Sequence, residues 1–218
     1  MDRKNNIPKF PESYLGDKSD EYENSASMER NQKRTTLITL QYLFDEKLNN
    51  IGFEDALKES TYLILDLGCG TGFSTEVLLA EGFRVIAVDI LIDMLSKAVK
   101  KKQFFLNNKN VEYLLADINH LPFRGNSIDH TISISAYNFI TYGKEDIREI
   151  NKTINNSAKY LHEILKQNGR IVLEFYPKDD DELNFFISSF INNGFKGFMV
   201  KNNPRQKGGQ TFLLLKRC

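Results

Sequence analysis

The segment "ILDLGCGTGFS" (residues 64–74) decides the fold class of this 218-residue chain. Its apolar, β-branched beginning predicts a buried strand. The alternate glycines Gly68, Gly70 and Gly72 predict a tight turn that leads into a helix. Open α/β sheets bring their backbone close to a nucleotide at such turns. The segment therefore indicates a nucleotide-binding α/β fold.

The same alternation of strand and helix continues along the chain. Helical spacing of apolar residues is found at residues 73–83, 92–106, 150–169 and 181–195. Apolar runs predict strands at residues 61–68, 84–90, 111–118, 127–136, 170–177, 197–202 and 211–217. The last two strands have no helical pattern between them and must form a hairpin. We therefore expect a Rossmann-like, doubly wound, seven-stranded sheet, mostly parallel, with one antiparallel strand in a C-terminal hairpin.

The first 30 residues are polar, carry Pro8 and Pro11, and read as an extended N-terminal arm or flap. A helix is expected from Met28 onward. The predicted organisation is thus an arm at residues 1–30 and one domain at residues 31–218.

Composition excludes several classes of protein. Lys plus Arg and Asp plus Glu both number 29, so no overall basic field favours nucleic acid. The longest apolar runs, about five to seven residues, are far short of a membrane span. The beginning "MDRKNNIPKF" has no apolar core of a secretory signal, and a cytoplasmic location is expected.

Cysteines and histidines give no reason to expect a disulfide or a metal. Cys69 lies in the glycine turn and Cys218 is the last residue of the sequence. No CxxC pair is present, and His120, His130 and His162 are not spaced as metal ligands.

The acidic residue before the turn selects among nucleotides. Asp66 precedes Gly68 by two positions, and the glycine spacing is GxGxG, whereas dinucleotide sites use GxGxxG. A carboxylate there would repel a pyrophosphate, but it suits the ammonium group of S-adenosylmethionine (SAM), which carries no phosphate. The expected cofactor is therefore SAM.

Two more acidic residues follow the next two strands. Asp89 ends the predicted strand at 84–90, where a carboxylate can accept both ribose hydroxyls. Asp117 follows the third strand, where it can bond the adenine amino group while Ile118 packs on the ring. The alternative is that Asp89 and Asp117 cap a helix or a turn.

On these motifs the chain resembles the class I SAM-dependent methyltransferases, and within them the small-subunit ribosomal RNA (guanine-N7) methyltransferases. The similarity covers most of residues 10–215. Its most specific signatures are the Pro-Glu-x-Tyr arm with Tyr22 and Gln32, "SISA" after the fourth strand, and "FYPK" with the later "GF.G" and Pro204. The domain at 31–218 is thus expected to be a SAM-dependent methyltransferase domain.

The sequence departs from this family at two places. Eukaryotic members carry a lysine-rich tail after the last strand, and they tend to have a basic residue where Ser27 stands. The tail concerns nucleolar targeting, not methyl transfer.

The expected cofactor contacts come from the glycine turn, the strand ends and the arm, whose tyrosines would close over SAM. For the arm, a flap that only covers the core is an equal alternative. The contacts are Tyr14, Tyr22, Asp66, Gly68, Cys69, Gly70, Gly72, Asp89, Ile90, Met94, Asp117, Ile118 and Ser133.

The acceptor side needs no proton-transfer catalyst, because guanine N7 has a free lone pair. We expect side chains after the fourth and fifth strands to place an unpaired base, aromatic rings stacking on it. Packing of these rings in the core or a lid is the alternative. The expected substrate contacts are Ser135, Tyr137, Asn138, Phe139, Tyr176 and Pro177.

The resemblance also implies partners. The acceptor would be ribosomal RNA in the pre-ribosomal small subunit. A small zinc-binding activator protein would pair with the exposed edge strand "VEYLL", Val111 to Leu115.

Two other functions stay open. One is a class I methyltransferase for a small metabolite, because the same core serves many substrates. The other is a SAM-binding ribosome assembly factor without activity. The basic segment at residues 201–207 and the cleft aromatics favour RNA, and a closed apolar lid would favour a metabolite.

Overall fold

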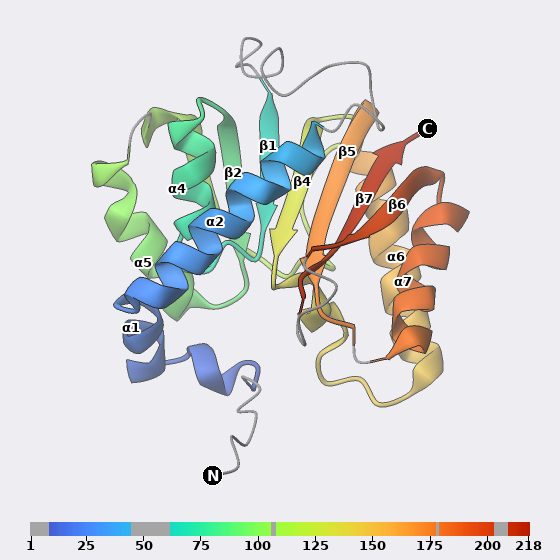
Figure 1. Ribbon diagram of the computed structural model, residues 1–218, viewed down its shortest axis with the longest axis horizontal. Coiled ribbons are helices and arrows are strands. Elements are labelled where there is room, and N and C mark those ends of the chain that lie inside the picture. Colours follow the sequence, from blue (N-terminus) through green and yellow to red (C-terminus); the bar gives the residue numbers. More distant parts are fainter. Residues whose placement is uncertain (1–8, 45–61, 106–107, 178, 203–208) are drawn as a thin grey trace.

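A computed structural model describes residues 9–44, 62–105, 108–177, 179–202 and 209–218 (Figure 1). Its centre is a seven-stranded sheet in the order β3-β2-β1-β4-β5-β7-β6. Strand β7 runs antiparallel to both its neighbours, β5 and β6, and the other neighbouring pairs are parallel. The predicted sheet and hairpin are confirmed. The strands are β1 (Leu63–Leu67), β2 (Arg84–Asp89), β3 (Val111–Leu115), β4 (Ile128–Ile134), β5 (Leu165–Phe175), β6 (Phe195–Lys201) and β7 (Thr211–Arg217).

Helices cover both faces of this sheet. In Figure 1, α2 crosses in front of the strands beside α4 and α5, while α6 and α7 lie together near β6 and β7. The α-helices are α1 (Asp17–Glu23), α2 (Ala26–Leu43), α4 (Phe73–Ala80), α5 (Ile92–Lys101), α6 (Ile147–Ile164) and α7 (Asp180–Asn192). The short 3-10 helices are η1 (Glu12–Tyr14), η2 (Lys102–Phe104), η3 (Asn108–Asn110) and η4 (Tyr137–Thr141).

Two hydrophobic cores result, one on each face. Ile64 of β1 belongs to the core beneath α2 and α4, whereas its neighbour Leu65 belongs to the core beneath α6 and α7. Successive side chains of a strand point to opposite faces, so a strand buried on both faces is apolar at most of its positions. This explains why the central strands read as continuous apolar runs.

Two predictions about secondary structure are wrong. The arm expected to be extended contains η1 and α1, and α2 begins at Ala26 and not at Met28. The helix expected to end at Gly169 ends at Ile164, and β5 begins at the next residue. Asn168 has a φ of 64°, and the pairing of β5 with β4 shifts register in this part. The polar "KQNG" segment is therefore an irregular beginning of the strand, although its composition resembles the end of a helix.

Within the described ranges, no helix has the length and hydropathy needed to cross a bilayer. In the same ranges, no group of three or more His, Cys, Asp or Glu side chains is arranged to hold a metal ion. Both cysteines are free thiols, Cys69 buried and Cys218 exposed.

Candidate functional site

The three predicted acidic residues lie at one edge of the sheet. Asp66 is the last residue but one of β1, Asp89 ends β2, and Asp117 follows the end of β3 by two positions. These strands are parallel neighbours, so their carboxyl ends meet at the same edge. The fold thus brings together residues that are far apart in the sequence, at the edge where open α/β sheets bind ligands.

The glycine turn packs closely against its surroundings. Gly68 and Cys69 both donate their N–H groups to the carbonyl of Val88, at 2.8 and 2.9 Å. Gly68 has a φ of 72°, and a Cβ at this position would lie 2.2 Å from the Cβ of Ala136. Only glycine permits this conformation and lets the segment after β4 touch the turn.

The turn also touches α5. A Cβ on Gly70 would lie 3.3 Å from Cε of Met94, and one on Gly72 would lie 3.0 Å from Cβ of Ala98. Met94, an expected cofactor contact, therefore stands directly against the turn. At all three positions a Cβ would meet other protein atoms, so the glycines let Ala136, Met94 and Ala98 pack directly against the backbone of the turn.

Asp89 connects β2 to this turn. Its Oδ2 accepts the N–H of Gly70 at 2.8 Å, and its Oδ1 accepts the N–H of Leu91 at 2.8 Å. Burial raises the pKa of Asp89. A carboxylate offers about four lone-pair positions, and the N–H groups of Gly70, Leu91 and Ile90 take three of them, so Asp89 keeps one acceptor site for a ribose hydroxyl.

Asp66 is almost fully buried and faces α4. Its Oδ2 accepts hydrogen bonds from the hydroxyls of Ser74 at 2.7 Å and Thr75 at 2.8 Å. Burial raises the pKa of Asp66 to about 6. A nearby ammonium group would favour the ionised form, and this contact stays a prediction.

Asp117 makes the contact of a turn residue. Its Oδ1 accepts the N–H of Asn119 at 2.8 Å, which is the capping role considered as the alternative. Ile118 is half-buried beside it, and Ile90 is exposed at the end of β2. The exposed Ile90 and half-buried Ile118 leave apolar surface for an adenine ring.

Ser133 and Cys69 lie deeper than a direct cofactor contact requires. Ser133 is fully buried, and its hydroxyl donates to the carbonyl of Leu67 at 2.9 Å. The Cys69 thiol is buried, and burial raises its pKa well above the ordinary value. Both side chains therefore support the turn from within the structure.

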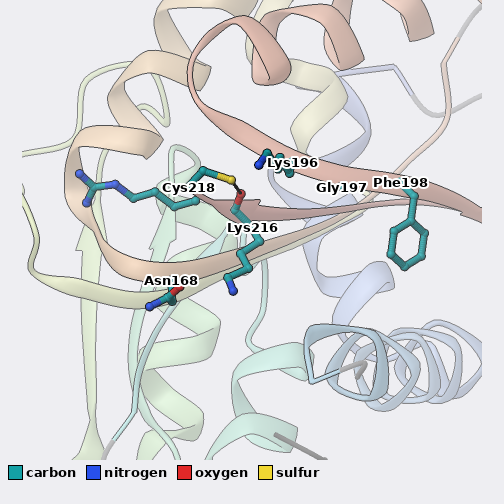
Figure 2. Close-up of a pocket in the computed structure, with 7 residues that line it drawn as sticks. Asn168, Lys196, Gly197, Phe198, Lys216 and Cys218 are labelled. Atoms are coloured by element: carbon teal, nitrogen blue, oxygen red, sulfur yellow. Dashed lines mark hydrogen bonds between the residues drawn. The ribbon is translucent and has the colours of Figure 1, made fainter. Parts of the chain in front are cut away.

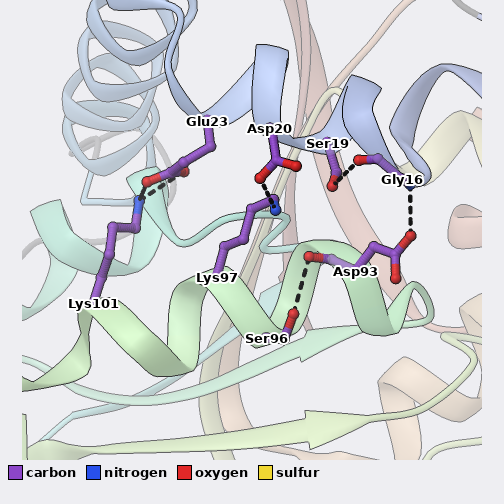
Figure 3. Close-up of polar contacts among 8 residues, drawn as sticks. All are labelled: Gly16, Ser19, Asp20, Glu23, Asp93, Ser96, Lys97 and Lys101. Carbon is purple, nitrogen blue, oxygen red and sulfur yellow. Dashed lines mark hydrogen bonds and ion pairs between the residues drawn. The ribbon is translucent and has the colours of Figure 1, made fainter.

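The arm is fixed to α5 by three polar contacts at successive turns of one helix face, as Figure 3 shows. This arrangement holds α1 over the helix that supports the glycine turn. The contacts are Gly16 N–H to Asp93 (2.7 Å), Lys97 to Asp20 (2.6 Å) and Lys101 to Glu23 (2.9 Å).

Aromatic rings continue the contact between arm and domain. Tyr22 lies 5.9 Å from Tyr14 and 6.1 Å from Phe73, the first residue of α4, between ring centroids. Burial raises the pKa of both tyrosines, most strongly that of Tyr22, whose hydroxyl bonds Gln32. The arm therefore reaches the helix that follows the glycine turn.

The expected substrate residues follow β4 and β5, and backbone contacts join the two segments. The Asn138 amide donates to the Tyr176 carbonyl at 2.7 Å and accepts the Tyr176 N–H at 3.1 Å. Ser135 has a φ of 55° and donates its hydroxyl to Glu174 at 2.6 Å. Both polar side chains thus hold the acceptor side together, and Tyr176 is exposed, with the half-buried Pro177 beside it.

Tyr137 does not fit its expected role. Its ring is fully buried, and its hydroxyl pairs with that of Ser157 at 2.7 Å. Phe186 and Phe190 of α7 lie 5.7 and 6.1 Å from the ring. The side chain belongs to the core beneath α6 and α7, because the first turn of η4 points it inward.

Phe139 is partly covered by the arm. The ring of Phe10 stacks on it with centroids 4.5 Å apart and planes at 18°. Tyr142 contacts the same Phe10 edge-on at 5.0 Å. The arm therefore spans the carboxyl edge of the sheet, from α5 to the segment after β4.

Two contributors were not expected from the sequence. Phe10 carries no local signal for its contact with Phe139. Glu174, however, interrupts the apolar run "RIVLEFYP", and a carboxylate inside a buried strand is a readable sign of a built polar site.

A separate hollow of about 430 Å³ lies at the other end of β5, between Asn168, Lys196, Lys216 and Cys218 (Figure 2). In the backbone register of β5 and β7, Arg170 lies opposite Lys216, four residues along the strand from Glu174. This hollow is not part of the site at the carboxyl ends.

Comparison with known proteins gives a consistent result. Residues 65–173 match the family described as "Methyltransferase domain". The chain is 30% identical over 200 residues to the 18S rRNA (guanine(1575)-N(7))-methyltransferase of Saccharomyces cerevisiae, covering 90% of this chain and 66% of the relative. It is 28% identical to the 18S rRNA (guanine-N(7))-methyltransferase bud23 of Schizosaccharomyces pombe, covering 72% and 57%. The chain thus spans less than two thirds of either relative.

Among solved structures, a protein from Pyrococcus horikoshii OT3 has the same fold. The TM-score is 0.65 at 18% identity, covering 91% of this chain and 99% of that one.

Proposed function

The chain belongs to the methyltransferase domain family, and from this premise we propose that it methylates N7 of a guanine in small-subunit ribosomal RNA. The cofactor of this domain is SAM. The observation that carries the choice of acceptor is the similarity to the yeast relative, whose name states that reaction.

The chemistry requires orientation more than proton transfer. When bound, SAM would supply a methyl group on a sulfonium. The N7 lone pair would attack the methyl carbon in line with the carbon–sulfur bond, which breaks and releases the neutral thioether. No proton leaves N7, so none of the residues at the site has to act as a base. The protein holds the two reactants in line and excludes water from between them.

The site divides these tasks between its two sides. The glycine turn and Asp89 hold the amino-acid and ribose parts of the cofactor, and Asp66 supplies a carboxylate to its ammonium group. The segments after β4 and β5 receive the base, with Phe139 and the exposed Tyr176 as stacking surfaces. Such stacking contributes about 1–3 kcal/mol per base.

The arm covers part of the acceptor side. Phe10 covers one face of Phe139, so a base that stacks on this face must displace Phe10. The contacts to α5 lie on the cofactor side and do not involve Phe10. The contacts to α5 can therefore stay in place over the cofactor side while Phe10 makes room for RNA.

A partner at β3 follows from the same proposal. Strand β3 forms one edge of the sheet, and Leu115 at its end is half exposed. Lys102 donates to the carbonyl of Val111 and shields the beginning of the strand. A small zinc-binding activator protein would add a strand along Glu112–Leu115. Equal solubility and equal SAM affinity with and without the co-expressed activator would contradict this pairing.

Action on precursors of the small subunit implies a location in the cytoplasm, or in the nucleus of a eukaryote. The basic segment at residues 201–207, which favoured RNA in the sequence, lies largely outside the described residues.

The experiment uses the purified chain with its co-expressed activator, methyl-labelled SAM and isolated small-subunit precursors. Label at N7 of one guanine, absent with Asp89→Ala, is expected. Label that enters only a small-metabolite fraction would overturn the RNA acceptor. Cofactor binding without any transfer, in a chain that still supports ribosome maturation, would show an assembly factor and contradict the activity.

A further inference from the structure

Glu174 is a carboxylate placed deep inside the domain, near the end of β5. It is fully buried, as are Leu173 and Phe175 on either side. A buried charge is strongly unfavourable unless hydrogen bonds or an opposite charge compensate it. The nature of its partners therefore indicates what the residue does.

Among the described residues, the hydrogen-bond partners of the Glu174 side chain are neutral donors. Ser135 donates to Oε2 at 2.6 Å, and Gln210 donates to Oε1 at 3.3 Å. The Tyr176 hydroxyl also donates to this carboxylate, which contributes to the raised pKa of Tyr176. Among the ion pairs recorded for the described residues, none includes Glu174. Hydrogen bonds from neutral groups therefore compensate the charge of Glu174, and no cation among the described residues does so.

These donors come from three segments around the acceptor side. Ser135 follows β4, Tyr176 follows β5, and Gln210 immediately precedes β7. The residue after Ser135 is Ala136, which stands against Gly68 of the cofactor turn. The hydrogen bond to Glu174 and the contact with the glycine turn are therefore made by adjacent residues.

We propose that Glu174 is a positioning residue on the acceptor side, which orients the Ser135 and Tyr176 hydroxyls and favours positive charge on the acceptor base. The inference rests on the proposed guanine-N7 reaction and adds a residue to it. The N7 lone pair forms the new bond to the methyl carbon while the carbon–sulfur bond breaks. The positive charge leaves sulfur and appears on the base, and no proton is released.

A fixed negative charge on the acceptor side lowers the energy of that charge movement. Because Glu174 is buried, water screens its field weakly. Asp66 and Asp89 lie on the cofactor side, where negative charge favours the sulfonium instead. Negative charge on the cofactor side therefore stabilises the reactants, whereas the negative charge of Glu174 stabilises the methylated product.

The test compares Glu174→Gln with the wild-type chain in single-turnover methylation of small-subunit precursors, with the activator present. The glutamine keeps the shape and removes the charge. We expect a rate lower by about 10- to 100-fold, with an unchanged KM for SAM. Ser135→Ala keeps the charge, and its rate should fall by about threefold. Glu163→Gln, an exposed surface carboxylate of α6, is the matched control and should leave the rate unchanged.

A second readout needs neither cofactor nor RNA. Ultraviolet titration of the tyrosines, with Tyr176→Phe to assign the signal, should show a lower phenol pKa for Tyr176 in Glu174→Gln than in wild type. If Glu174→Gln does not fold, Tyr176→Phe and Ser135→Ala carry the test, and each should slow transfer without changing the KM for SAM.

The outcomes separate the two proposals. Wild-type chain that leaves every guanine unmodified overturns the proposed function, and with it the role of Glu174. Wild-type activity that Glu174→Gln retains within about twofold overturns only the role of Glu174. A variant that loses SAM binding and thermal stability together with rate would show a purely structural residue.

Discussion

The Asp89 carboxylate accepts the N–H of Gly70 at 2.8 Å, so the end of β2 holds the glycine turn that follows β1. Asp89→Ala removes this bond together with the bond to Leu91. We expect the Kd for SAM to rise by about 10- to 100-fold, because each charge-assisted bond contributes about 1.5–3 kcal/mol. Titration calorimetry measures it, and Asp181→Ala, an exposed carboxylate of α7, is the control. An unchanged Kd for Asp89→Ala would exclude this role.

Gly68 and Gly143 offer a matched pair of substitutions that tests the close packing of the glycine turn. Both have positive φ, 72° and 77°, but only the Cβ of Gly68 would meet another residue, Ala136 at 2.2 Å. Gly143→Ala should lower the free energy of unfolding by about 1 kcal/mol, from backbone strain alone. Gly68→Ala should cost more stability and abolish measurable SAM binding. Equal effects of the two substitutions would show that close approach at Gly68 is unimportant.

Replacing the buried Asp66 by a residue that cannot ionise should stabilise the fold and weaken SAM binding. Its pKa is raised from 3.8 to about 6, so its contribution to the stability of the cofactor-free protein is full below pH 3.8 and is lost as pH rises through 6. Asp66→Asn cannot ionise. It should raise the free energy of unfolding at pH 8 by about 1–3 kcal/mol while it weakens SAM binding. Denaturant unfolding and calorimetry measure the two effects, and a destabilised variant at pH 8 contradicts the account.

His130 should make the fold sensitive to mild acid. Burial, with a smaller effect of Arg170, lowers its pKa from 6.5 to about 3. Its contribution to stability is therefore present above pH 6.5 and is lost as pH falls toward 3. In an Asp66→Asn background, which removes the opposing titration, we expect a loss of about 1 kcal/mol between pH 7 and pH 5.5.

His130→Asn is the control for this titration. The asparagine keeps an acceptor for the Arg170 N–H, which His130 Nδ1 binds at 3.3 Å, and cannot titrate. The acid dependence should disappear in this variant. If it persists unchanged, another group is responsible.

The meeting of the glycine turn and the acidic residues at one edge of the sheet was predictable because its signals are local. Asp66, Gly68 and Gly70 lie within one strand and its turn, and Asp89 and Asp117 each end an apolar run. Parallel pairing then places them at one edge without further information. The mostly parallel sheet follows from the alternation of helix and strand, and the antiparallel β7 follows from the missing helix between the last two strands.

The acceptor side was less predictable because its contacts are distant in the chain. Ser135 meets Glu174 across 39 positions, and Phe10 meets Phe139 from the other end of the sequence. Tyr137 follows β4 as Phe139 does, and only the direction of η4 decides which ring enters the core. Likewise, "KQNG" has the composition of a helix end. The residues on either side of it, Leu165 and Arg170, pair with β4, so the segment lies in an irregular part of β5.

The central claim, a guanine-N7 acceptor in small-subunit ribosomal RNA, is tested most directly in cells. N7-methylguanine is mapped in this RNA by borohydride–aniline cleavage, with the gene present, deleted, or replaced by the Asp89→Ala form. The account predicts one cleavage site that requires the wild-type gene and is lost in both other strains. An identical cleavage pattern in all three strains would contradict it.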